Sequence, residues 1–516
     1  MIIVFSYIKA EEDAFDDNLV NEMVNYSGTH HINPQHFYEP NNVKELEALV
    51  ANASKTKSKI RPVGRFLSPN GVASCKKGMV SLANCDRIIK VDKEKQQITV
   101  ESGAIVDTIL KELANHNLTL SNFSSIKEQQ MGGWTQVAAH GTGAKLPTVD
   151  EMIVSLKVIT PSKGTITLGK DSSSAEEREM FRLVRCGLGA LGIVSEMTLQ
   201  CMKSHYLEEI TETKPLNDIY SGHIELLRDY RHVRYMWIPY ADSVVIVKSN
   251  PTEKLSLEEK NSNEKDPAAP LKKLLLRKRK DDKRNENIDG MSFSQLRDEL
   301  IDLAPLDTKH IKDINRAEAN FWNNNQGVRI GSSDEILGFD CGGQQWVLEM
   351  AFPVGTLDEP TFADLNFVTE LKSKLEEANI PAPAPIEQRW TSSSTSYMSP
   401  AYSENEKELF SWVGIIMYLP PGQDDNEREK ITRRFEDYAD IMRTVGKKYG
   451  AVPHWAKIEL PGLIRGKISN EQYVNKLNQL KESLQERYDT KRFSSARKVL
   501  DPDHILSNHL LDTLFD

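Results

Sequence analysis

Glu387 and Arg389 are a pair whose types and spacing suggest chemistry, because they stand two apart in the stretch IEQRW. Side chains two apart on a strand share a face. On one face, the carboxylate would accept hydrogen bonds from hydroxyl groups of a bound molecule, and the guanidinium would donate to a carbonyl oxygen. The spacing alone equally fits an exposed ion pair, which contributes little to stability.

Three stretches rich in glycine and other small residues occur within the first 200 positions. They are Arg61–Gly71 (RPVGRFLSPNG), Gln129–Ala144 (QQMGGWTQVAAHGTGA) and Arg185–Val194 (RCGLGALGIV). Such loops expose backbone N–H groups that cradle phosphate, and glycine permits a close approach of the backbone. None has the spacing of a P-loop. Together they predict a site for a long polyanionic cofactor, although any one of them alone would fit a simple turn.

The composition limits the class of protein. A length of 516 residues indicates two or more domains, and 27% charged with 39% hydrophobic residues is typical of a soluble globular chain. The net charge of -10 argues against general nucleic-acid binding. The five cysteines are scattered without CxxC spacing, so we expect neither a disulfide framework nor a metal site.

Targeting and membrane signals are sparse. No apolar run approaches the roughly 20 residues of a membrane span. The opening MIIVFSYI is short and has no basic residue before it, so we expect neither a signal peptide nor a transit peptide there.

Hydrophobic periodicity predicts an α+β fold with small sheets, because strands and helices alternate without the regular βαβ repeat of a dinucleotide-binding fold. Helices are predicted at 41–56, 104–116, 175–184 and 470–488 and in the second half of 404–449. Strands and hairpins are predicted at 58–63, 79–83, 87–103, 153–169, 192–200, 207–250 and 327–355. The apolar stretch 500–511 is expected to pack back on the body of the protein.

A charged segment at 251–288 interrupts the second half of the chain. It contains LKKLLLRKRKDDKR (Leu271–Arg284), a basic stretch with an apolar flank. A mobile surface insertion is the favoured interpretation. The alternative is a docking surface for anionic lipid or for a partner protein.

Nine motifs between Asn25 and Asn508 resemble, in this order, the aldonolactone oxidoreductases of the vanillyl-alcohol oxidase superfamily, and most closely the dehydrogenases of that family. The motifs are RPVGRFLSPNG, LTLSNFSSIKEQQMGG, AHGTGAKLPTVDE, RCGLGALGIVSEMTLQC, SSDEILGFDCGGQQWV, PAPAPIEQRWT, FSWVGIIMYLP, HWAKIELP and LDPDHILSN. The resemblance implies a two-domain PCMH-type FAD-binding fold with a cap domain built on an antiparallel sheet. The FAD-binding domain would comprise residues 1–205 with 490–516 packing back on it, and the substrate or cap domain residues 206–489.

The resemblance also implies a reaction. The C2 hydroxyl of L-galactono-1,4-lactone, or of the related gulonolactone, would be oxidised with hydride transfer to flavin N5, and the 2-keto product would enolise to ascorbate. Cytochrome c would reoxidise the flavin, whereas the related oxidases use oxygen. The resemblance further implies a mitochondrial location on the intermembrane-space side of the inner membrane. It also implies peripheral membrane contact and association with an assembly intermediate of respiratory complex I.

The same resemblance assigns residues to FAD. Expected at the cofactor are Pro62, Val63, Gly64, Arg65, Phe66, Leu67, Ser68, Ser125, Gln130, Gly132, Gly133, His140, Gly141, Thr142, Gly143, Gly192, Ile193 and Val194. Relatives with covalent FAD carry histidine where this chain has Leu67. Leucine offers no nucleophile to the flavin, so we expect non-covalent FAD. Arg65 and Phe66 replace a Ser-Gly pair of the plant pattern, and a phenylalanine at positive φ would cost about 1–3 kcal/mol.

Four residues are expected at the reaction itself. Glu387 and Arg389 match the family pair that contacts the substrate region. Lys457 in HWAKI would stabilise negative charge at flavin N1, or be a solvated lysine. Ser124 stands where dehydrogenases of the family carry alanine and oxidases glycine, so it is expected to hinder oxygen. His454 would either orient the site or pack, and we expect a structural role for His140 rather than that of a base.

Overall fold

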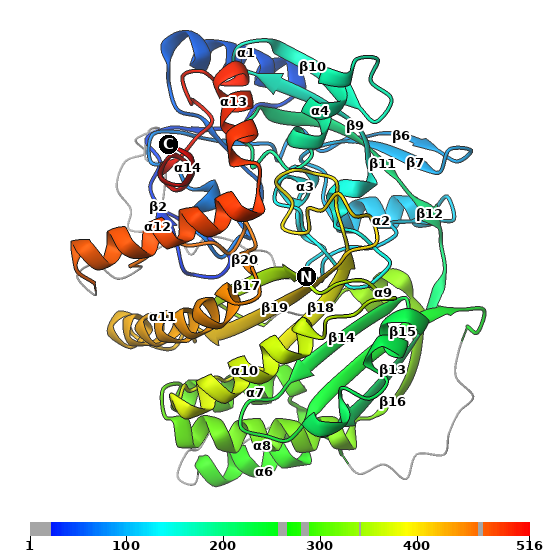
Figure 1. Cartoon of the computed structure of the whole chain (residues 1–516), viewed down its shortest axis with the longest axis vertical. Helices are drawn as coiled ribbons and strands as arrows, with labels where there is room; N and C mark the ends of the chain where they lie inside the picture. Colours follow the sequence, from blue (N-terminus) through cyan, green and yellow to red (C-terminus); the bar gives the residue numbers. More distant parts are fainter. Residues whose placement is uncertain (1–21, 256–265, 280–287, 340–341, 463–467) are drawn as a thin grey trace.

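The computed structural model describes residues 22–255, 266–279, 288–339, 342–462 and 468–516 (Figure 1). The opening MIIVFSYI, Cys341 and much of the charged segment, including 280–284 of its basic stretch, lie outside these ranges. The described chain mixes helices with antiparallel and short parallel sheets, which confirms the predicted α+β class. Two large sheets, each with its own core, face one another across the middle of the molecule (Figure 1).

The first part of the molecule carries the three glycine-rich loops. Its larger sheet is antiparallel and has the order β10 (Gly164–Gly169), β9 (Ile153–Thr160), β11 (Ile193–Gln200), β7 (Gln97–Glu101) and β6 (Ile88–Asp92). A small parallel sheet has the order β3 (Phe37–Tyr38), β5 (Met79–Ser81) and β4 (Arg61–Val63). The helices are α1 (Val43–Thr56), α2 (Val106–Ala114), α3 (Met131–Gln136) and α4 (Ala175–Val184).

Local sequence explains where these helices begin. The Asn42 side chain accepts from the Glu45 backbone N–H at the start of α1. Ser174 and Glu177 form a reciprocal capping box at the start of α4, so that two otherwise unpaired backbone donors are satisfied. The β9–β10 and β6–β7 hairpins appear where the alternating pattern predicts them.

The second part is built on one eight-stranded antiparallel sheet, here called the cap sheet. Its order is β16 (Gly327–Ser332), β13 (Tyr206–Lys214), β15 (Val244–Thr252), β14 (His232–Trp237), β18 (Ile386–Ser392), β19 (Leu409–Tyr418), β17 (Gln345–Pro353) and β20 (Val452–Pro453). Helices α10 (Ala363–Glu377) and α11 (Asp425–Lys447) pack on one face and bury a large apolar core. The opposite face turns toward the glycine-rich loops.

Part of the charged segment is a packed helix, which corrects the prediction of a mobile insertion for that part. Helix α6 (Ala269–Lys278) packs on α7 (Phe293–Leu303) and α8 (Thr308–Asn324). Leu271, Leu274 and Leu275 are buried there. Their spacing of three and four residues is that of an amphipathic helix, and this signal outweighs the high charge around it.

The final segment returns to the first part of the molecule. It contains α12 (Asn470–Arg487), α13 (Thr490–Leu500) and α14 (His509–Phe515). Leu500, Leu506 and Leu511 are buried in the cores of the first part.

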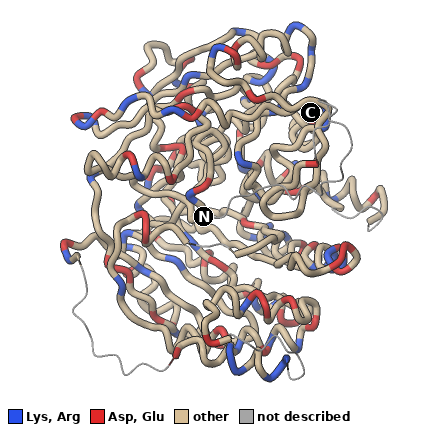
Figure 2. Tube along the Cα trace, turned by 180° about the vertical axis from the view of Figure 1, so that it is seen from behind, with Lys and Arg blue, Asp and Glu red and all other residues tan. Residues whose placement is uncertain are grey.

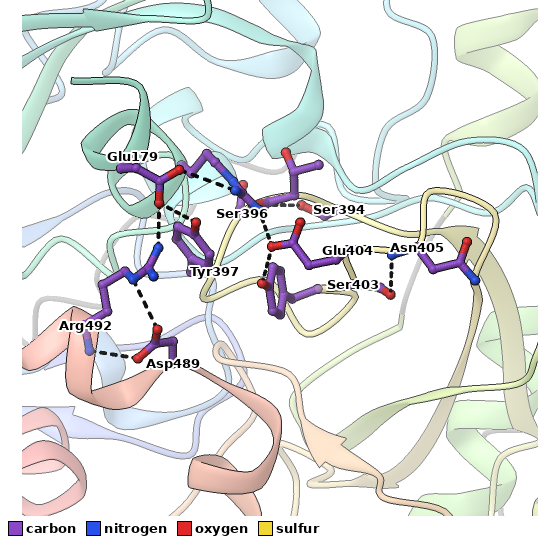
Figure 3. A network of polar contacts seen from close by, with 12 residues as sticks. Glu179, Ser394, Ser396, Tyr397, Ser403, Glu404, Asn405, Asp489 and Arg492 are labelled. Atoms are coloured by element: carbon purple, nitrogen blue, oxygen red, sulfur yellow. Dashed lines mark hydrogen bonds and ion pairs between the residues drawn. The ribbon is translucent and has the colours of Figure 1, made fainter. Parts of the chain in front are cut away.

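A loop after β18 also crosses to the first part. Tyr397 donates to Glu179 of α4, and Arg492 of α13 lies on the same carboxylate, so three separate segments meet at one side chain (Figure 3). Behind them Ser394 and Ser396 both donate to the buried Asp150. This network holds the strand that carries Glu387 and Arg389 against the first part.

Candidate active site

A cavity of about 240 Å³ lies between the first part and the cap sheet. Fifteen of the predicted cofactor-binding residues line it: Pro62, Val63, Gly64, Arg65, Phe66, Leu67, Ser68, Ser125, Gln130, Gly132, Gly133, His140, Gly192, Ile193 and Val194. The three glycine-rich loops therefore meet around one cavity, although more than 100 residues separate the first from the last.

Gly141, Thr142 and Gly143 do not line this cavity, and their contact with the cofactor stays a prediction. The Gly143 N–H donates to Trp390 O at 2.7 Å, and Thr142 donates to Val233 O. A Cβ on Gly143 would lie 2.5 Å from Arg231 O. This end of the loop thus forms the seam with the cap sheet, and its small residues serve that close approach.

Phe66 has φ of 56°, which is in the left-handed region that favours glycine. The plant pattern has glycine at this position. Its ring is buried beside Val63, Cys75 and Met79. Its carbonyl accepts from the Tyr26 N–H at 3.0 Å. Burial of the ring offsets the backbone strain, so the loop keeps its place in the cavity wall.

Glu387 and Arg389 both project into the cavity from β18. The alternate residues Gln388 and Trp390 are fully buried on the other face, where Trp390 Nε1 donates to Asp364 at 2.8 Å. Arg389 Nε lies 3.5 Å from Glu387 Oε2. The two-residue spacing thus places both charged groups on the cavity side of a strand that is anchored from behind.

Glu349 of β17 is the site residue that sequence reasoning missed. It is buried, and its carboxylate forms two ion pairs. Its Oε1 lies 2.5 Å from Arg389 Nη2, and its Oε2 pairs with Lys457 Nζ. Burial opposes its ionisation, but Lys457 and Arg389 together hold its pKa well below the usual range. The available signal was a lone carboxylate in the apolar strand QQWVLEMAF, since a buried charge needs partners.

Two histidines complete this cluster. His140 Nε2 lies 3.2 Å from Glu349 Oε2, and its ring stacks on Trp412 with centroids 3.8 Å apart. His454 Nδ1 accepts from the Ala456 N–H at 3.0 Å. Burial and the nearby Lys457 hold the pKa of His454 well below its usual value, so it is neutral.

The cluster is better suited to organising charge than to holding a metal ion. Glu349, His140 and His454 place potential ligand atoms within 4.8 Å of one another. However, both Glu349 oxygens already face cationic side chains, Arg389 on one and Lys457 on the other. A divalent ion there would sit among positive charges.

Ser124 is held in a fixed orientation at the cavity wall. Its Oγ donates to Gln129 Oε1 and accepts from Trp134 Nε1 at 3.0 Å. The hydroxyl hydrogen and one lone pair of its oxygen are therefore both engaged by protein groups.

The cavity fits FAD in its shape and donor set. Gly132 packs against Ser102 so closely that a Cβ would lie 3.1 Å from the Ser102 Cβ, which brings loop backbone to the wall. Ser102 Oγ lines the cavity and has no hydrogen-bond partner among the described residues. An unpaired buried hydroxyl indicates a polar ligand. Leu67 also lines the wall and presents no nucleophile.

Family models match both halves of the chain. A FAD-binding domain model matches residues 34–169, and the model described as D-arabinono-1,4-lactone oxidase matches residues 197–514. The cofactor is accordingly FAD. Solved structures with the same fold include cholesterol oxidase from Brevibacterium sterolicum, with a TM-score of 0.69 and 14% identity over 97% of this chain and 98% of that one.

Curated relatives are much more similar. L-galactono-1,4-lactone dehydrogenase, mitochondrial, from Brassica oleracea is 44% identical, covering 99% of this chain and 84% of that protein. The Arabidopsis thaliana protein of the same name is 43% identical, covering 99% and 83%. L-gulonolactone oxidase from Bos taurus is 26% identical, covering 95% and 97%. No helix among the described residues is long and apolar enough to span a membrane. With a matched family model over most of its length and relatives above 40% identity, this chain belongs to the FAD-dependent aldonolactone oxidoreductases.

Proposed function

We propose that the protein oxidises L-galactono-1,4-lactone at C2 and passes the electrons through FAD to cytochrome c. The hydroxyl loses its proton, the C2–H bond is lost as hydride, and the 2-keto lactone enolises to ascorbate. Bound FAD supplies the hydride acceptor. The observation that supports this reaction best is the row Glu387, Arg389, Glu349 and Lys457 on the cap-sheet side of a cavity whose opposite wall is the glycine-rich loops.

The two carboxylates of the row, Glu349 and Glu387, have different roles in the proposed reaction. Glu349 is saturated by Arg389 and Lys457, so it cannot take a proton from substrate. Glu387 is the more accessible carboxylate, with Arg234 and Arg389 each no closer than 3.5 Å. Glu387 would therefore accept from a substrate hydroxyl, while Arg389 donates to the lactone carbonyl. Glu349 holds Arg389 and Lys457 at a fixed separation.

Lys457 would stabilise the negative charge that arrives with the hydride. It projects into the cavity from the loop after β20, and one carboxylate orients it. A positioned cation lowers the energy of a developing anion more than a mobile cation does, because little reorganisation is needed.

The proposed electron acceptor is cytochrome c rather than oxygen. Support comes from Ser124, whose bulk is fixed at the wall by Trp134 and Gln129. An aldonolactone oxidase that uses oxygen is the alternative. The relatives named mitochondrial support a location in that organelle, and use of cytochrome c would place the enzyme on the intermembrane-space side of the inner membrane.

Stopped-flow spectroscopy tests the whole proposal. The purified yellow protein would be reduced anaerobically with L-galactono-1,4-lactone and then mixed separately with oxygen and with cytochrome c. Fast reoxidation by cytochrome c and slow reoxidation by oxygen is the expected result. Fast reoxidation by oxygen would make the protein an oxidase, and no reduction by any aldonolactone would refute the proposed reaction.

A further inference from the structure

A second cavity of about 40 Å³ lies beside the first. Ser125 and Arg389 line both cavities, so the two share a wall. We call the second cavity the side chamber; its polar lining consists of Ser125, Thr142, Glu209, His232, Arg234, Ser249 and Arg389. The roles assigned above to Glu387, Arg389 and Lys457 do not use it.

The register of the cap sheet makes the two cavities one continuous surface. Arg234 of β14 stands opposite Arg389 of β18, and His232 stands opposite Ser249 of β15. Ser249 in turn stands opposite Glu209 of β13. Directly opposed residues project from the same face of an antiparallel sheet. The side chamber therefore continues the row that carries Arg389, in the direction of the sheet edge at β16.

His232 presents a hydrogen-bond acceptor that no protein group uses. It is only 3% exposed, and its Nδ1 donates to Thr142 O at 2.8 Å, which leaves Nε2 as the acceptor of the neutral ring. Burial lowers the pKa of His232 to about 3, so the ring stays neutral. Among the described residues, Nε2 has no hydrogen-bond partner. An unpaired buried acceptor costs free energy unless a ligand supplies a donor.

The charges around the chamber are already balanced. Arg234 lies 3.5 Å from Glu387 and sits over the Phe339 ring at 4.0 Å. Glu209 pairs with Arg329 at 2.5 Å. Arg389 pairs with Glu349 at 2.5 Å. Since all three charged groups of the lining have counter-charges, the chamber suits an uncharged hydroxylated group and not an ion.

We propose that the side chamber binds the hydroxylated two-carbon arm at C4 of the lactone while the ring lies over Glu387 and Arg389, with His232 Nε2 accepting from an arm hydroxyl. The inference rests on the proposed function and extends it to substrate selection. It makes His232 a residue that distinguishes lactones by the length of the arm and not by the ring.

The test compares two lactones on the variant His232→Asn. The shorter amide reproduces the donor to Thr142 O but lacks an acceptor at the position of Nε2. The probes are L-galactono-1,4-lactone and the four-carbon 1,4-lactone that has the same configuration at C2 and C3 and no arm at C4. The second-order rate of anaerobic flavin reduction should fall about 10-fold or more for the six-carbon lactone. It should change less than about 2-fold for the four-carbon lactone.

His205→Asn is the matched control, because the His205 ring also bonds a backbone carbonyl through Nδ1, at 3.2 Å from Lys203 O, and lines neither cavity. It should leave both rates unchanged. Ser249→Ala provides a second variant, for which the six-carbon rate should also fall selectively. Equal losses with both lactones, or none, in both chamber variants would overturn the side-chamber assignment. If neither lactone reduces the wild-type flavin, the proposed reaction itself fails, and that result is distinct.

Discussion

Glu349 shows how one buried side chain organises several others. It lies between Arg389 and Lys457, both of which the proposed reaction uses, and it contacts His140 as well. Removing one partner of such a group leaves uncompensated charge in a poorly solvated place. The consequence for function is larger than for an exposed pair, because two cations lose their common anchor at once.

Glu349→Gln should therefore slow flavin reduction by the lactone by about 100-fold, as expected when catalytic groups shift by about 1 Å. FAD should remain bound, since Glu349 contacts the glycine-rich loops only through the His140 side chain. The matched control is Glu370→Gln on α10, which removes the ion pair of Glu370 with Lys448 outside the cavity and should leave the rate unchanged. A wild-type rate in Glu349→Gln would show that the two cations hold their places without it.

Leu67 carries the prediction on cofactor attachment. Because leucine has no nucleophile, all of the flavin should appear in the supernatant after acid precipitation of the protein. Absorbance of the supernatant and fluorescence of the protein band on a denaturing gel provide the measurement. Flavin fluorescence that stays with the band would mean that another cavity residue forms a covalent bond.

At the scale of elements, the seam between loop and cap sheet sets the width of the cavity. Gly143 has φ of 149° and pairs with the end of β18 through the Trp390 carbonyl. A methyl group at this position meets the Arg231 carbonyl and forces the two surfaces apart.

Gly143→Ala should lower the free energy of unfolding by about 1–3 kcal/mol and should also reduce kcat/KM. The control is Gly327→Ala on the edge strand β16, where an added Cβ has no atom within 4 Å among the described residues. Thermal unfolding and steady-state assays on both variants check the result. Equal free energies of unfolding for the two variants would contradict a close contact between the Gly143 loop and the cap sheet.

Helix α6 raises the question of partner docking. Three basic residues of the helix and its C-cap Arg279 already have acidic partners: Lys272 with Asp266, Arg277 and Lys278 with Asp313, and Arg279 with Glu299. Figure 2 shows blue residues at the lower end of the trace, red residues on the neighbouring segments, and both colours over the rest of the molecule. Paired charges attract an anionic surface less than unpaired ones.

Replacing Lys272, Lys273 and Arg277 by glutamine should change neither turnover nor sedimentation with vesicles that contain anionic lipid. Co-purification with an assembly intermediate of complex I provides the second measurement. Loss of vesicle or complex I binding at unchanged turnover would instead establish the docking role of this helix.

The sequence predicts elements well where periodicity is strong and poorly where the partner is remote. The hairpins, α4 and α11 lie where patterns indicate, and the alternation around Glu387 places it on the correct face. The role of Glu349 could not be predicted from the sequence, because its partners Arg389 and Lys457 are 40 and 108 positions away. The role of Gly143 was likewise hidden, since a glycine-rich loop looks the same whether it faces a cofactor or another sheet.

At the scale of the whole molecule, buried neutral histidines link stability to pH. The native pKa of His232 is lowered by burial to about 3 from 6.5. The unfolded chain binds a proton below about pH 6.5, whereas the native state does not until about pH 3. Stability from this residue is therefore lost as the pH falls from about 6.5 toward 3.

Between pH 7.5 and 5.5, His232 should account for about 1.4 kcal/mol of lost unfolding free energy. His232→Asn should reduce the pH-dependent loss by that amount, whatever its absolute stability at the two pH values. Urea unfolding of the FAD-bound protein at the two pH values gives the comparison. An identical pH dependence in wild type and variant would show that the native ring can take up a proton.

The cofactor cavity also depends on residues far along the chain. Arg61, in the first glycine-rich loop, donates to Leu506 O at 2.9 Å, and Asn508 donates to Gly71 O and Val72 O in the same loop. Asn70 donates to Trp455 O. During synthesis on the ribosome, this loop emerges more than 400 residues before the side chain that secures it. The cavity therefore stays unfinished until residue 508 has emerged, and stable capture of FAD follows the synthesis of that segment.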